Sequence, residues 1–182
     1  MDIDNIIKER RSIRHFKKKD IPWKKINEIL ESFTYAPCAG DIQNFRLIVF
    51  KNDGKLNKAC HSQSSVVESN FLVAVCSDDS DLVISYKEKG KFFGIQNTAA
   101  GIQNMMLKAY SMKVGSCWIR TYDEDKIRAI LKIPEKISLH AIVAFGYFKD
   151  KPEMPLRLDT QKVISFNEFG KYRRDPLPLI KK

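Results

Sequence analysis

The sequence lacks the features that mark several classes of protein. Its four cysteines are far apart with no C-x-x-C pair, and its three histidines are scattered, so we expect neither a metal site nor a redox dithiol. The longest apolar stretches, residues 71–76 and 141–145, are far shorter than the roughly 20 residues that a membrane-spanning helix requires. The N-terminus is charged from Asp2 onward and shows no apolar signal segment. These absences predict a cytoplasmic protein with reduced thiols and no membrane association.

Several catalytic and nucleotide-binding motifs are also missing. There is no G-x-S-x-G elbow and no H-E-x-x-H pair, which excludes the hydrolases that depend on them. A cysteine nucleophile assisted by a histidine stays open, although no pattern favours it. The chain has neither a Walker loop nor a G-x-G-x-x-G turn, so any phosphate group would have to be bound by another device.

Length and composition predict one globular domain over residues 1–182. The chain is 43% hydrophobic and 30% charged, and it has only eight glycines and seven prolines, which argues against disorder. Its 32 lysines and arginines outnumber 22 aspartates and glutamates, for a net charge of +10. This excess favours an anionic partner, whether nucleic acid, a phosphate-bearing cofactor or an acidic lipid surface.

Hydrophobic periodicity predicts helices and strands in alternation. A short helix with Ile3, Ile6 and Ile7 on one face precedes a second helix that begins near Pro22. A long helix is expected over residues 92–113, and Thr121 followed by Glu124 has the capping-box pattern of another. Strands are expected over residues 46–50, 71–76, 116–120 and 140–148. From residue 149 the pattern is lost, apart from a possible short strand or helix around residues 163–169, and we expect this tail to wrap a second subunit.

A basic run, Arg10-Arg11-Ser12-Ile13-Arg14, is the best candidate for a phosphate site. Alternate residues of an extended segment point the same way, so Arg10, Ser12 and Arg14 could form one cationic face. Guanidinium groups beside a hydroxyl suit a phosphate monoester. A solvated basic surface would explain the same five residues.

Together with motifs further along, this run resembles the FMN-dependent nitroreductase-like oxidoreductases in their compact form. The resemblance covers nearly the whole chain, and its specificity lies in the order of the motifs. Residues 10–16 look like the family's R-R-S-x-R-x-F, and residues 36–43 look like its A-P-S-A-x-N-x-Q loop. Residues 103–109 are similar to its central helix, residues 114–119 to its G-x-G-S/T-x-W strand, and residues 140–147 and 155–157 complete the series.

The resemblance implies a fold and an activity. The fold is α+β with three layers: a mixed central sheet flanked by helices, a long central helix, and a C-terminal tail that wraps the partner subunit. The protein would be a homodimer with FMN at the interface. NADH or NADPH would deliver hydride to flavin N5 in a ping-pong cycle, and a small-molecule acceptor such as a quinone or nitroaromatic would take the electrons. The flavin carries this chemistry, so no catalytic side chain is required.

The resemblance also assigns roles to residues. Arg10, Ser12 and Arg157 would hold the phosphate and ribityl chain together with Arg11 of the same motif, and Arg14 would reach the N1 and C2 carbonyl edge of the flavin, supporting negative charge there. The partner subunit would contribute four residues: Pro37, Cys38, Ala39 and Gln43. Backbone N–H groups of Gly115 and Ser116 would lie near N5 and O4, and Gln63 would face the flavin.

Three positions depart from the family pattern, and other functions stay open. Asp41 stands where the family has Asn, Asn44 follows Gln43 in place of Pro, and Val114 replaces a glycine. A carboxylate accepts but does not donate hydrogen bonds, which puts the contact of Asp41 with the flavin in doubt. The alternatives are a ferredoxin-linked or specialised flavin enzyme of dehalogenase or flavin-consuming type, and a non-enzymatic flavin carrier. A basic nucleic-acid-binding domain is disfavoured, because no recognisable binding motif or aromatic platform is present.

Overall fold

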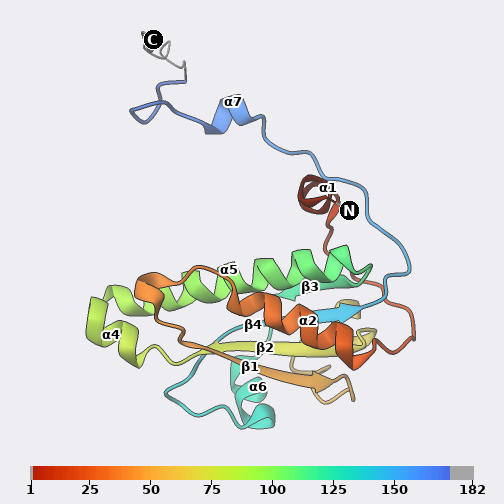
Figure 1. Cartoon of the computed structure of the whole chain (residues 1–182). Helices are drawn as coiled ribbons and strands as arrows, with labels where there is room; N and C mark the ends of the chain where they lie inside the picture. The colour runs from red at the N-terminus through yellow and green to blue at the C-terminus, as the bar shows by residue number, and fades with distance from the viewer. Residues whose placement is uncertain (1, 173–182) are drawn as a thin grey trace. The chain divides into compact units, whose positions relative to one another are not determined.

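The structure is a computed structural model that describes residues 2–172 (Figure 1). The chain divides into two compact units, Met1–Pro152 and Glu153–Lys182. The described part of the second unit is mostly exposed and contains one short helix, α7 (Thr160–Val163). All the strands formed by residues 2–172 lie in the first unit.

The sheet has four strands in the order β1-β2-β4-β3. Its strands are β1 (Phe45–Lys51), β2 (Phe71–Ser77), β3 (Gly115–Ile119) and β4 (Ser138–Gly146). Each neighbouring pair is antiparallel, with Lys51 opposite Phe71 at one end of the β1–β2 ladder and Phe45 opposite Ser77 at the other. The α+β class is confirmed, but the expectation of a mixed sheet is corrected. Among residues 2–172 the parallel pairing is limited to an isolated bridge between Ser12 and Ser116.

Helices cover both faces of this sheet, so the three-layer arrangement is confirmed (Figure 1). One face is covered by α2 (Trp23–Thr34) and α5 (Lys89–Ser111), which pack closely on each other. Gly101 of α5 permits this approach, because a Cβ there would meet the ring of Phe33 at 2.5 Å. The core on this side includes Ile102 and Val143.

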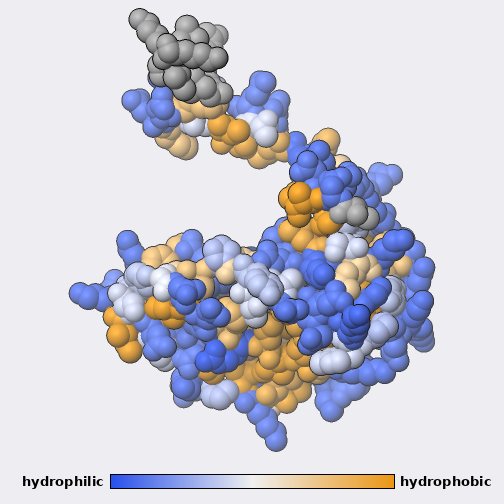
Figure 2. Space-filling model, in the orientation of Figure 1, coloured by the Kyte–Doolittle hydropathy of each residue, from blue (hydrophilic) through white to orange (hydrophobic). Residues whose placement is uncertain are grey.

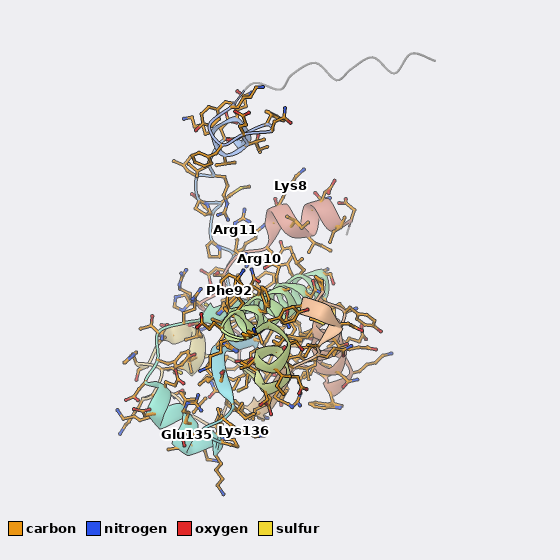
Figure 3. All side chains as sticks on the ribbon, turned by 90° about the vertical axis from the view of Figure 1, so that its left-hand side faces the viewer. Lys8, Arg10, Arg11, Phe92, Glu135 and Lys136 are labelled. Carbon is orange, nitrogen blue, oxygen red and sulfur yellow. The ribbon has the colours of Figure 1, made fainter. Side chains whose placement is uncertain are left out.

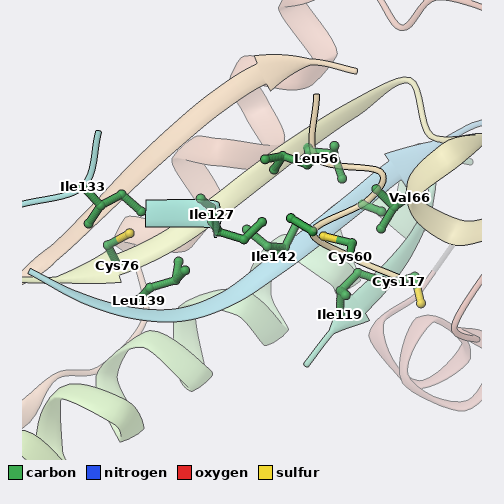
Figure 4. Packing of buried hydrophobic residues seen from close by; sticks show 14 of the residues in the cluster. Leu56, Cys60, Val66, Cys76, Cys117, Ile119, Ile127, Ile133, Leu139 and Ile142 are labelled. Carbon is green, nitrogen blue, oxygen red and sulfur yellow. The ribbon is translucent and has the colours of Figure 1, made fainter. Parts of the chain in front are cut away.

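The opposite face is covered by α6 (Glu124–Leu131) and by the segment that ends in α3 (Ser64–Val67). Figure 4 shows Leu56, Ile127 and Ile142 meeting over the strands in this second core. The remaining elements are α1 (Ile3–Glu9), α4 (Ser80–Tyr86) and a 3-10 turn, η1 (Ala39–Asp41).

Most predicted elements are confirmed, with two corrections of detail. The long helix runs over Lys89–Ser111 and so begins before the predicted residue 92, and its Ile95 is 51% exposed. The cap of α6 is Asp123 and not Thr121: the Asp123 carboxylate accepts a 3.2 Å hydrogen bond from the Lys126 amide. A carboxylate at this position also favours the positive end of the helix dipole.

The surface of the first unit is largely hydrophilic, with an apolar patch over the edge strand β1 (Figure 2). Within residues 2–172, no helix has the length and apolar character to cross a membrane. The same residues contain no cluster of side chains that could hold a metal ion.

Candidate functional site

The predicted basic segment follows α1 and is fixed along the sheet. The Ile13 amide donates a 2.9 Å hydrogen bond to the Ser116 carbonyl oxygen, and the Lys17 amide donates one of 2.7 Å to Tyr147. Ile13 and Phe16 are both 1% exposed, so their side chains anchor the segment in the core. Arg14 points outward, which agrees with the alternation expected of an extended segment.

Arg11 differs from its neighbours, because it turns inward and is 7% exposed. Its Nη1 donates hydrogen bonds of 2.7 Å and 2.9 Å to the carbonyl oxygens of Lys8 and Arg10. Figure 3 shows Arg10 and Arg11 where the chain leaves α1. In this chain Arg11 therefore closes the C-terminal end of that helix.

A cavity of 420 Å³ lies beside the basic segment and β3. Its volume falls within the range of small-molecule sites. Arg14 and Gln63, both predicted to bind the cofactor, line it. The other lining residues are His15, Ser64, Ser65, Cys117, Trp118, Ile119, Arg120 and Thr121.

The cavity combines positive charge with an aromatic wall. The Arg120 guanidinium lies 6.0 Å from the centroid of the Trp118 ring. Burial raises the pKa of the Cys117 thiol, while the Ser65 hydroxyl and the charges of Arg14 and Arg10 act in the opposite direction. The charges of Arg10 and Arg14 therefore both act on the Cys117 thiol in β3.

Hydrogen bonds fix the amide of Gln63 at the edge of this cavity. Its Nε2 donates to the carbonyl oxygens of Cys60 and Thr121, each at 2.8 Å. The bond to Thr121 joins the segment before α3 to the residues after β3. Gln63 thus holds together two of the chain segments that line the cavity.

Gly115 and Ser116 lie at the start of β3, but the cavity is lined by later residues of that strand. Ser116 is 2% exposed, and its Oγ is a buried polar atom that makes no hydrogen bond among the described residues. Trp118 Nε1 is also buried and makes no hydrogen bond among the described residues. Buried polar atoms are almost always paired in folded proteins, so this strand has unused hydrogen-bonding capacity.

The predicted loop of residues 37–43 lies elsewhere in the same chain. The Ala39 amide donates a 2.9 Å hydrogen bond to Asn97 Oδ1 in α5, and Gly40 and Asp41 have φ angles of 59° and 57°. A side chain at Gly40 would also collide with the Tyr86 hydroxyl. Asp41 lies near Cys38, with 3.9 Å from Sγ to Oδ1. None of the loop residues lines the 420 Å³ cavity of its own chain.

Arg157 lies in the second unit and is exposed. Ser65, Arg120 and Thr121 were not among the predicted site residues, although they line the cavity. Arg120 and Thr121 directly follow β3, and polar residues at the end of a predicted strand are a signal that could have found them. Ser65 carries no comparable signal in the sequence.

Comparison with known proteins agrees with this architecture. The sequence model described as "Nitroreductase family" matches residues 7–147. The chain is 31% identical over 159 residues to a "Putative NADH dehydrogenase/NAD(P)H nitroreductase" of Methanothermobacter thermautotrophicus, covering 84% of this chain and 80% of that protein. A protein of the same description from Archaeoglobus fulgidus is 28% identical over 155 residues, covering 81% of this chain and 86% of that protein.

Solved structures agree on the fold. Nitroreductase A of Vibrio parahaemolyticus has a TM-score of 0.84 at 20% identity, over 93% of this chain and 78% of that one. The NADPH:FMN oxidoreductase of Vibrio harveyi, solved with NAD+, has a TM-score of 0.81 at 19% identity, over 92% of this chain and 77% of that one. The family match spans the basic segment, the cavity and all four strands. The chain therefore belongs to the nitroreductase family of oxidoreductases.

Proposed function

We propose that this chain binds FMN in the 420 Å³ cavity and uses it to oxidise NADH or NADPH and reduce a quinone, nitroaromatic or similar small molecule. The observation that carries the proposal is the meeting of Arg14, Gln63 and Trp118 around one cavity in a chain that matches the family model over residues 7–147. The Vibrio harveyi protein of similar fold is an NADPH:FMN oxidoreductase, which supports the choice of cofactor.

The residues present fit a phosphate-bearing aromatic cofactor. The cavity offers two guanidinium groups, a carboxamide and hydroxyl groups beside an indole ring, so it can satisfy both an anion and a flat ring system. The buried Ser116 Oγ without a hydrogen-bond partner indicates further capacity at the same strand.

Each side chain then has a defined task. Arg10 and Ser12 would hold the phosphate and ribityl chain, and Arg14 would place positive charge beside the ring edge that becomes negative on reduction. Bound FMN supplies hydride transfer at N5, which explains why the chain needs no catalytic nucleophile. Trp118 would form a wall that limits access of water, and the anchored Ile13 keeps Arg14 in position.

A second subunit completes this proposal. The residue 37–43 loop lies outside the cavity of its own chain, which supports a role in the site of a partner. We propose a homodimer in which each subunit contributes Pro37, Cys38, Ala39 and Gln43 to the other, with residues 1–182 acting as one functional domain whose tail wraps the partner. The four free cysteines, three of them buried, support a cytoplasmic location.

Titration of the purified protein with FMN tests this proposal. Arg10→Ala should weaken FMN binding by about 30-fold, because a charge-assisted hydrogen bond contributes about 2 kcal/mol. The control is Lys24→Ala, which removes an exposed charge on α2. Equal FMN affinity in the wild type and Arg10→Ala would contradict the phosphate assignment.

A further inference from the structure

A series of buried hydrogen bonds runs from the turn after β2 to the residue 37–43 loop. Asn44 Nδ2 donates a 2.8 Å hydrogen bond to Asp79 Oδ1, and Asn97 Nδ2 donates one of 3.0 Å to Asn44 Oδ1. Asn97 Oδ1 then accepts the Ala39 amide proton at 2.9 Å. Asn44 and Asn97 are each 4% exposed and Asp79 is 6% exposed. These three side chains, here called the amide relay, lie outside the 420 Å³ cavity.

Asp79 is the anionic end of the amide relay. Its Oδ1 also accepts a 2.6 Å hydrogen bond from Ser77 Oγ, and its Oδ2 accepts one of 3.0 Å from Ser138 Oγ. Ser77 Oγ lies in turn 2.6 Å from His140 Nε2. Gly94 in α5 leaves space for the carboxylate, because a side chain there would overlap Asp79 Oδ1. Hydrogen-bond donors thus converge on this one group, as a buried negative charge requires.

The charge of Asp79 fixes the orientation of both asparagine side chains. A carboxylate only accepts hydrogen bonds, so Asn44 must turn its Nδ2 toward Asp79. Asn44 Oδ1 then faces Asn97, which must present its own Nδ2. This leaves Asn97 Oδ1 for the Ala39 amide, which only donates. One buried charge therefore sets the polarity of every hydrogen bond between Asp79 and the loop.

The loop needs to be held, because its backbone is in an unfavourable conformation. Gly40 and Asp41 have φ angles of 59° and 57°, and this left-handed region is costly for a residue other than glycine. Asn97 contacts the chain on both sides of these two residues, at the Ala39 amide and, through Nδ2 at 3.4 Å, at the Ile42 carbonyl oxygen. A reversed Asn97 amide would place donor against donor at Ala39 and acceptor against acceptor at Ile42.

We propose that Asp79 is a positioning residue for the flavin site: through Asn44 and Asn97 it holds the residue 37–43 loop in the conformation that the partner's cavity requires. The inference rests on the proposed function, in which this loop contributes to the site of the second subunit. Asn44 stands where the family pattern has proline, which has no side-chain amide, so that pattern does not supply the amide relay.

Moving the charge one position along the amide relay tests the role of polarity. Asp79→Asn keeps the size of the side chain but permits the relay to reverse, so the Ala39 amide should exchange about tenfold faster, the effect of one lost hydrogen bond. Adding Asn44→Asp puts an acceptor-only group next to Asn97 again, so the double variant should return close to wild-type exchange. The control Ser138→Ala removes one bond to Asp79 but leaves its charge, and should exchange like the wild type.

These exchange rates are measured without FMN. Wild-type exchange of Ala39 in Asp79→Asn would overturn the inference. A double variant that exchanges as fast as Asp79→Asn or faster would also overturn it, because a merely structural role predicts added damage from a second buried substitution and no rescue. Asn44→Leu is the second single variant: it interrupts the amide relay, leaves Asp79 with its two serine donors, and should speed Ala39 exchange to a similar extent.

Mixed dimers show which cavity the loop serves. Two differently tagged chains are combined, with Arg10→Ala and Asp79→Asn placed either on different chains or on the same chain. If the loop serves the partner, the first arrangement leaves one cavity unaltered, and half of the sites should bind FMN with wild-type affinity. The second arrangement should leave no such site. The reverse result would show that Asp79 acts on the cavity of its own chain and would overturn the inference.

FMN titration of the wild type keeps the two proposals apart. A wild type that takes up no FMN overturns the proposed function, whatever the exchange rates are. A wild type that binds FMN, together with an Asp79→Asn homodimer of equal FMN affinity, overturns the inference alone. The expected result for that homodimer is about tenfold weaker FMN binding, the effect of one hydrogen bond.

Discussion

The Ile13 amide donates a 2.9 Å hydrogen bond to the carbonyl oxygen of Ser116, and this contact joins the basic segment to the strand that lines the cavity. Gly115, beside that bond, has no room for a side chain: an added Cβ would lie 2.8 Å from Ile13 Cγ1. Ile13 and Gly115 do not line the cavity, but the position of Arg14 beside the cavity depends on both of them.

Gly115→Ala should displace the basic segment. Forcing a methyl group against Ile13 should cost about 1–3 kcal/mol of unfolding free energy and weaken FMN binding in the same variant. Urea denaturation and FMN titration measure the two effects. Adding Ile13→Ala gives the methyl group space, so the double variant should lose less stability than the sum of the single losses. Additive losses would show that the two residues do not compete for the same space.

Asn97 should control the conformation of the residue 37–43 loop. Its Oδ1 accepts from the Ala39 amide at 2.9 Å, and its Nδ2 donates to Asn44 Oδ1 at 3.0 Å. Asn97→Ala leaves these buried groups unpaired and should cost about 1–3 kcal/mol of stability. Hydrogen exchange should show faster exchange of the Ala39 amide. The exposed neighbour variant Gln96→Ala serves as the control, and an unchanged Ala39 exchange rate in Asn97→Ala would contradict this role.

Glu68 should make stability depend on acid pH. Hydrogen bonds from Lys149 and His15, and from the Phe16 amide, lower the pKa of Glu68 from 4.5 to about 2. A carboxylate with a lowered folded-state pKa stabilises the fold above its unfolded pKa, and this stabilisation is lost as pH falls from about 4.5 toward about 2.

Glu68→Gln should therefore reduce stability at about pH 7. Between about pH 7 and about pH 3, this variant should lose less stability than the wild type loses. Urea denaturation at both pH values measures the difference. Glu135→Gln, at an exposed position labelled in Figure 3, is the matched control and should follow the wild type. A Glu68→Gln curve parallel to the wild type would show that the Glu68 contacts do not stabilise the fold.

Sequence patterns predicted the strands and the long helix well, because these elements bury continuous apolar faces. Strand β2 is apolar along nearly its whole length and is fully buried, so its own sequence was enough to predict it. The direction of pairing was not predictable, since an apolar run has no preferred orientation relative to its neighbour. Helix α4 was missed because it is short and only Leu82 is buried.

Residue patterns alone predicted the candidate site only within one segment, and Gln63 was predicted only through the family resemblance. The face formed by Ser12 and Arg14 followed from the two-residue repeat of an extended chain. Gln63 and Arg120 reach the same cavity through tertiary packing, and no spacing in the sequence connects them. The link between His140, Ser77 and Asp79 likewise depends on the register of β2 with β4.

The visible spectrum of the purified protein during anaerobic addition of NADH or NADPH tests the central claim most directly. The proposed function predicts flavin absorption bands after loading with FMN, bleaching on addition of the reduced nucleotide, and return of the bands with a quinone or nitroaromatic. A protein that stays colourless after incubation with FMN, or one whose flavin bands persist with both NADH and NADPH, would contradict it.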